Sequence, residues 1–299
     1  MTACGALIAS GFFSSPAVRT ALALGAAVAL VAGPIGVFTV VRGQSFAGEA
    51  LGDIGTTGGS GAALVGAGPL WGFLAFDLAA AGLMEILGVE RRRGRDLATG
   101  VVLGAGLGLA ALLLFLDSTE HSASGMTVTI QFGSLFTVGG ATLPLALALA
   151  LLVLLVLALV ARPLLLASTS PELAAARGVP VGLVGAVHLV ALSLSAALCA
   201  ITVGSILSTA LLVGPAAAAL RVARRPGRAT ALAAGLGVAA VWLGVLLAYD
   251  SYDWPPHHRG WPVSFFVVAL VFAEYVLCGI ARGRRRLPDP VPGIAAEGG

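Results

Sequence analysis

Long apolar runs, joined by short charged segments, occupy most of the chain. About 20 apolar residues in a helix are needed to cross the ~30 Å of bilayer hydrocarbon, where the backbone has no water to bond. About nine runs meet this description, at residues 17–41, 46–67, 70–89, 97–116, 143–161, 181–200, 204–220, 229–248 and 261–281. The second is glycine-rich and acidic, so about eight spans is the alternative. We therefore expect an all-α, polytopic membrane helical bundle of about eight or nine transmembrane helices.

The composition excludes several other classes of protein. Only 10% of the 299 residues are charged, against about 25% in a soluble domain. A net charge of +3 with scattered arginine clusters argues against a nucleic-acid partner. All 17 basic residues are arginine, and a Walker-A loop needs a lysine on the nucleotide phosphates. If ATP drives this protein, another subunit binds it.

Arginine placement predicts the orientation in a cell membrane, because cytoplasmic loops carry the positive charge. The clusters alternate with acidic or neutral loops and stand at Arg91–Arg95, Arg162 and Arg177, Arg221–Arg228, and Arg282–Arg286. This places the C-terminus in the cytoplasm. We treat residues 1–299 as one transmembrane domain, with an N-terminal segment at 1–16 and a Pro/Gly-rich tail at 287–299 that we expect to be disordered. The polar stretch at 117–142 fits a re-entrant or interfacial element on the outer side.

Glu49 and Asp53 are the strongest candidates for a functional site. Their i, i+4 spacing puts both carboxylates on one face of a helix. Acids within a bilayer are costly, and two neighbouring carboxylates repel unless one is protonated or a cation lies between them. A divalent metal would resolve that conflict. The alternative is that Glu49 pairs with Arg42 while Asp53 is protonated or faces water.

Weaker candidates lie elsewhere. His188 stands in the middle of the sixth run, where a hydrogen-bonded packing role is the alternative to a metal or partner contact. The outer loop "YDSYDWPPHHRGW" could contact a metal or a partner protein, or be a solvated loop, and its candidates are Asp250, Asp253, His257 and His258. Asp77 and Glu274 are acids within apolar runs for which the sequence suggests no specific role.

The segment 168–180 predicts a short helix on the cytoplasmic side. Ser170 can cap it, Pro171 suits its first position, and Gly178 can end it. It is either an ordinary connector or a coupling helix that inserts into a cytoplasmic ATPase. The residues assigned to coupling are Ser170, Pro171, Glu172, Leu173, Arg177 and Gly178.

Together these motifs resemble the permeases of ATP-driven zinc, manganese and iron uptake systems. The resemblance covers roughly 17–281 and is carried by "GPIGVFTVVRGQSFAGEALGD" (33–53), "FGSLFTV" (132–138), "LLLASTSPELAAARGVPVG" (164–182), "VGSILSTALLVGPAAAALR" (203–221) and "YDSYDWPP" (249–256). It implies a permease fold with no cofactor of its own, and a divalent metal as the transported substrate. It also implies partners: a second permease subunit, two ATPase subunits, and an extracellular metal-binding protein.

One position departs from the family. The family carries metal with an acid and a histidine one turn later, and here Asp53 stands at the histidine position after Glu49. Oxygen ligands suit Mn²⁺, whereas imidazole favours zinc, copper and iron. Two alternatives stay open: a permease for siderophore, haem or cobalamin, and an ion-coupled secondary transporter. The second would be expected to show an inverted repeat, which the sequence does not show.

Overall fold

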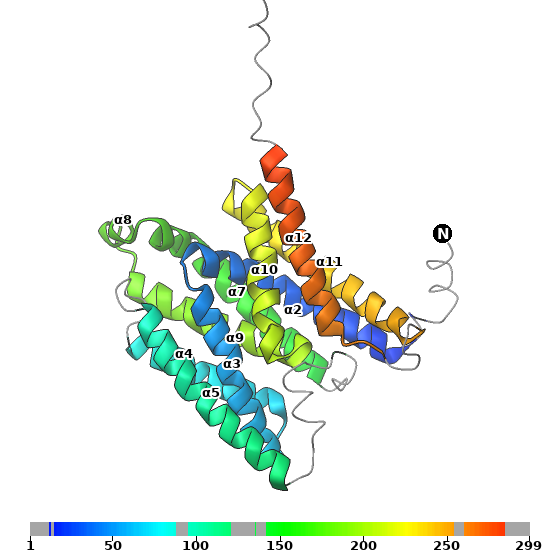
Figure 1. Ribbon diagram of the computed structural model, residues 1–299. Coiled ribbons are helices and arrows are strands. Elements are labelled where there is room, and N and C mark those ends of the chain that lie inside the picture. The colour runs from blue at the N-terminus through cyan, green and yellow to red at the C-terminus, as the bar shows by residue number, and fades with distance from the viewer. Residues whose placement is uncertain are drawn as a thin grey trace, which may run out of the picture.

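The computed structural model describes Phe12, residues 15–87, 95–120, Leu135, 142–253 and 260–284. Its long elements are helices (Figure 1): α2 (Pro16–Val41), α3 (Ser45–Leu64), α4 (Pro69–Ile86), α5 (Arg95–Glu120), α7 (Thr142–Thr169), α9 (Val181–Val203), α10 (Ser205–Val222), α11 (Pro226–Asp250) and α12 (Val263–Arg284). The short helix α8 (Pro171–Ala176) and the 3-10 turn η2 (Ser251–Asp253) complete the described elements. The predicted all-α fold is confirmed.

Every predicted apolar run corresponds to one long helix, although the ends differ. The largest difference is in α7, which continues through Pro163 to Thr169, eight residues beyond the predicted end at 161. The apolar run predicts only the part of the helix that crosses the bilayer hydrocarbon, whereas the helix itself continues through residues with polar side chains. There the Thr169 hydroxyl donates to the Leu165 carbonyl at 3.0 Å.

The chain is a multi-pass membrane protein. Among the described residues, six helices are long and apolar enough to cross a membrane, namely α2, α4, α7, α9, α11 and α12. In α7 and α12 only about a fifth of the apolar stretch is buried inside the bundle, whereas α2 and α9 bury most of theirs. The first two therefore present their surfaces to lipid, and the other two form the interior. Whether α3, α5 and α10 also span, giving eight or nine crossings, stays a prediction.

Glycines let α3 lie directly against α4. A side chain at Gly58 would collide with the backbone carbonyl of Gly72 and lie 2.8 Å from Phe76 Cβ, and one at Gly59 would lie 2.7 Å from the Phe73 ring. Without a strong hydrophobic force between helices in lipid, such close backbone approach is a main source of association. α3 also packs on α5, α9 and α10, so it lies well inside the bundle.

Substitution of Gly72 by alanine should destabilise the α3–α4 pair. The added Cβ would collide with the Gly58 carbonyl and lie 2.7 Å from Ala62 Cβ. Overpacking of this kind costs about 1–3 kcal/mol. The control is Gly82→Ala on the same helix, where an added Cβ meets nothing within 4 Å. Thermal unfolding of the detergent-solubilised protein should show a lower midpoint for Gly72→Ala only; equal midpoints would contradict the packing described.

Candidate functional site

A tight turn between α2 and α3 positions the candidate site. Gly43 adopts φ +67°, a left-handed conformation that favours glycine. The buried Gln44 donates its backbone N–H to the Thr39 carbonyl at 2.9 Å, and its side-chain oxygen accepts from Arg42 Nε at 3.0 Å. Because these bonds fix the start of α3, they also fix the direction of the side chains in its first turns.

Four polar side chains line one face of α3. Glu49, Asp53, Thr56 and Ser60 follow one another at spacings of four, three and four residues, which keeps them within one helix face. Glu49 is exposed, Asp53 is partly buried, and Thr56 and Ser60 are buried. The structure thus places the two predicted carboxylates at the open end of a polar stripe that runs into the bundle.

The neighbouring face of α3 is closed. Cβ positions built at Gly48 lie 3.0 Å from Leu212 of α10, 3.7 Å from Leu192 of α9 and 3.8 Å from Thr39 of α2. Glu49, the next residue, points away from this contact and remains open on the surface of the single chain. A carboxylate facing lipid is costly. An aqueous pathway or a second protein chain is therefore the environment that this side of α3 requires.

His188 lies in a different environment. It is fully buried on α9, with Nε2 3.4 Å from the Thr39 hydroxyl oxygen. That hydroxyl already donates to the Ile35 carbonyl at 2.9 Å, so in this contact His188 Nε2–H is the donor. Within the described part of the chain, His188 Nδ1 has no hydrogen-bond partner. No three His, Cys, Asp or Glu side chains of that part come together as a metal cluster, so His188 does not complete a three-ligand site with the two acids.

The short helix predicted between residues 168 and 180 is present as α8, and its cytoplasmic location stays a prediction. It begins at Pro171, and its exposed side chains include Glu172 and Leu173. The helix ends where the sequence predicts. Arg177 is its C-cap, and Gly178 follows in the left-handed conformation with φ +77°. The helix packs on α7 and α9 and projects at one end of the bundle (Figure 1).

The predicted capping by the Ser170 side chain was wrong. Ser170 occupies the capping position, but its hydroxyl makes no capping hydrogen bond. Only its carbonyl takes part, accepting from the Ala174 N–H at 3.0 Å. The residue is exposed, so water can satisfy the free amides of the first turn and the side chain is not needed there.

The outer-loop candidates are only partly described. Asp250 ends α11 and is partly buried, and the Asp253 backbone belongs to η2. His257 and His258 lie outside the described residues, as do the tail at 287–299 and most of both the N-terminal segment 1–16 and the polar stretch 117–142. A role for this loop with metal or partner therefore stays a prediction.

Sequence reasoning found no role for Asp77, which the structure places in a distinctive position. It is fully buried on α4, and neither carboxylate oxygen has a hydrogen-bond partner among the described residues. The Asp77 carboxylate fits against α3 because residue 55 is a glycine: a Cβ added there would lie 2.7 Å from Asp77 Oδ1. Two residues are about 200° around a helix, so Asp77 lies on the side of α3 opposite Asp53. The only sequence signal for Asp77 was that it is an acid within an apolar run. Nothing in the sequence indicated the contacts that Thr39 and Gln44 make.

A polytopic helical bundle with a carboxylate-bearing inner helix and a short projecting helix is the architecture expected of a membrane permease. Residues 14–272 match the model of the ABC 3 transport family, and the chain belongs to that family. This confirms the resemblance seen in the sequence motifs.

Individual relatives agree with this assignment. The manganese import system permease protein ScaB of Streptococcus parasanguinis is 30% identical over 238 residues, covering 80% of this chain and 82% of the relative. ScaB of Streptococcus pneumoniae is 31% identical with the same coverage. Among solved structures, PsaBC from Streptococcus pneumoniae in complex with Fab superposes with a TM-score of 0.77 at 24% identity, covering 91% of this chain and 94% of that chain. The last comparison shows that the fold is shared.

The contact between Thr39 and His188 can be tested by a double-mutant cycle. Thr39→Val should destabilise the protein because it leaves a buried imidazole N–H unpaired, and His188→Leu should relieve part of that loss. The expected coupling is about 0.5–1.5 kcal/mol, measured by unfolding of the solubilised protein. Thr202→Val is the matched control, because that hydroxyl bonds only to carbonyls of its own helix α9. Additive effects of Thr39→Val and His188→Leu would contradict the contact.

Proposed function

We propose that this chain is the membrane-spanning permease subunit of an ATP-binding cassette transporter that takes up a divalent metal ion, with Mn²⁺ as the foremost candidate. The observation that carries the proposal is the carboxylate pair Glu49 and Asp53 on the open face of α3. Relatives named as manganese import permeases support the choice of substrate. Two carboxylates also match the preference of Mn²⁺ for oxygen ligands.

The proposed site is completed by a second permease subunit. One chain offers two acids on this face, whereas an octahedral oxygen site for Mn²⁺ takes about six ligands. A two-fold axis beside α3 would bring two Glu49 and Asp53 pairs together, and water would complete the shell. The same pairing would cover Glu49, whose exposure to lipid would be costly.

Energy would come from separate subunits. The chain holds no lysine for a Walker-A loop, so ATP hydrolysis is assigned to cytoplasmic ATPase subunits, and this chain is not itself an enzyme. An extracellular metal-binding protein would deliver the ion. The metal is substrate here, and the permease needs no cofactor of its own.

Coupling is assigned to α8 and the residues around it. Glu172 and Leu173 are exposed on a short helix that projects at one end of the bundle, the end that arginine placement predicts to be cytoplasmic. Its two packing partners, α7 and α9, continue into the bundle, and α9 also packs on α3. A movement of α8 caused by an ATPase can therefore reach the helix that holds Glu49.

Removing either carboxylate should abolish transport. In proteoliposomes holding permease, ATPase and binding protein, Glu49→Gln and Asp53→Asn should each lower ATP-dependent ⁵⁴Mn uptake at least about tenfold, because each change removes a metal ligand. Glu274→Gln is the control, since it neutralises a half-buried acid on α12, away from this face. Normal uptake by both test variants, with the complex intact, would remove the proposed site.

Disrupting α8 should separate the permease from its ATPase. Leu173→Asp replaces an exposed apolar side chain with a charge and should abolish co-purification of the ATPase while the permease stays folded. Gly227→Asp is the matched control, because it adds the same charge on the cytoplasmic side at an exposed position where a Cβ meets nothing within 4 Å. Full co-purification and uptake with Leu173→Asp would count against the assigned role of α8.

A further inference from the structure

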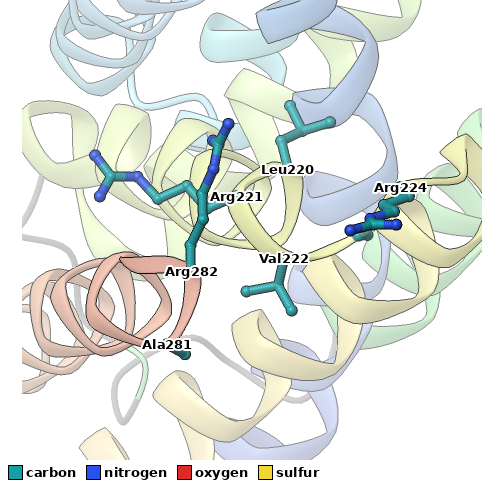
Figure 2. Close-up of a pocket in the computed structure, with 7 residues that line it drawn as sticks. Leu220, Arg221, Val222, Arg224, Ala281 and Arg282 are labelled. Carbon is teal, nitrogen blue, oxygen red and sulfur yellow. The ribbon is translucent and has the colours of Figure 1, made fainter. Parts of the chain in front are cut away.

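A basic pocket lies where α10 and α12 both end, on the side that arginine placement predicts to be cytoplasmic. It has a volume of about 210 Å³ and opens between the last turns of the two helices and the linker to α11 (Figure 2). Its lining combines three arginines with apolar side chains: Leu220, Arg221, Val222, Ala223, Arg224, Ala281 and Arg282. The transport mechanism proposed above makes no use of it.

One of the three arginines is held in a defined position. The Arg221 guanidinium lies over the Tyr275 ring, 3.7 Å from its centroid, and donates a hydrogen bond to the Tyr275 hydroxyl. Gly279, one turn after Tyr275 on α12, leaves room for it, because a side chain there would collide with the guanidinium. α12 therefore contains a tyrosine and a glycine that together seat an arginine of α10.

The other two arginines add positive charge at exposed positions. Arg224 and Arg282 are exposed, and Figure 2 shows them with Arg221 around the end of α10. Glu274 on α12 has no hydrogen-bond partner for its buried oxygen among the described residues, so that oxygen does not bond to any of the three arginines. Helix C-termini favour nearby cations, which explains single arginines at these ends. It does not explain a pocket between them that is lined by three.

We propose that this pocket binds the phosphate of an anionic phospholipid from the cytoplasmic leaflet. The guanidinium group matches phosphate oxygens with paired N–H donors. Arginine clusters on the cytoplasmic side lie at the headgroup level, where basic pockets between membrane helices recognise anionic headgroups. Leu220, Val222 and Ala281 supply an apolar wall for the glycerol and acyl region. Such a lipid would join the cytoplasmic ends of α10 and α12.

The experiment removes charge without disturbing the seated Arg221. Native mass spectrometry of the purified permease would measure binding of phosphatidylglycerol, with phosphatidylcholine and inorganic phosphate as separate arms. Removing both exposed arginines with Arg224→Gln and Arg282→Gln should weaken phosphatidylglycerol binding by about fivefold for each charge lost. The control pair Arg225→Gln and Arg228→Gln removes the same charge from exposed positions outside the pocket and should leave binding unchanged.

Three results would overturn the proposal. The first is equal loss of phosphatidylglycerol binding in the test and control pairs, which would indicate a general charge effect. The second is occupancy by inorganic phosphate at the same affinity, which would assign the pocket to a soluble anion. The third is unchanged lipid binding together with lost co-purification of the ATPase, which would make this surface a protein contact.

Discussion

The cost of placing a carboxylate against lipid governs how this protein can exist in a membrane. Glu49 is open on the surface of the single chain, although α3 packs on α4, α5, α9 and α10. A carboxylate within the hydrocarbon must be covered by protein or reached by water. The single chain therefore leaves this side of the bundle open, and we propose that a second permease subunit covers it. The same open side would allow a translocated cation to reach two carboxylates without crossing the packed interior.

Helix positions could be predicted because the bilayer imposes a length and an apolar composition on each span. Helix ends could not, as α7 shows: apolarity stops at residue 161, whereas backbone hydrogen bonding continues to Thr169. Whether α3 crosses the membrane was equally hard to predict from the sequence. Its glycines lower its hydropathy and its intrinsic helix propensity, yet they bring its backbone onto α4 at Gly58 and Gly72. Tertiary contact compensates for what the local sequence lacks.

The carboxylate pair was predictable for a local reason, since i, i+4 spacing places two residues on one face of any α-helix. Its surroundings were not. The contact of Thr39 with His188 joins residues 149 positions apart, and the pairing of Asp77 with Gly55 depends on how α3 and α4 approach each other. Likewise the predicted capping hydrogen bond of the Ser170 side chain is absent, because the residue is exposed and water can bond to the amides of the first turn instead. The spacing of residues in the sequence predicts neither long-range packing nor local hydration.

Aspartate at position 53, where the resemblance to the metal permeases implies a histidine, would change the chemistry of the proposed site. Imidazole is a neutral ligand that retains zinc and similar ions, whereas a second carboxylate adds negative charge and a harder donor. With Glu49 alongside, two chains would present four carboxylates around one path. That concentration of charge attracts a divalent cation strongly, but it also raises the cost of the empty site through mutual repulsion. In the mechanism we propose, separating the two pairs would release the ion toward the cytoplasm, and the movement transmitted from α8 would control the metal affinity of the site.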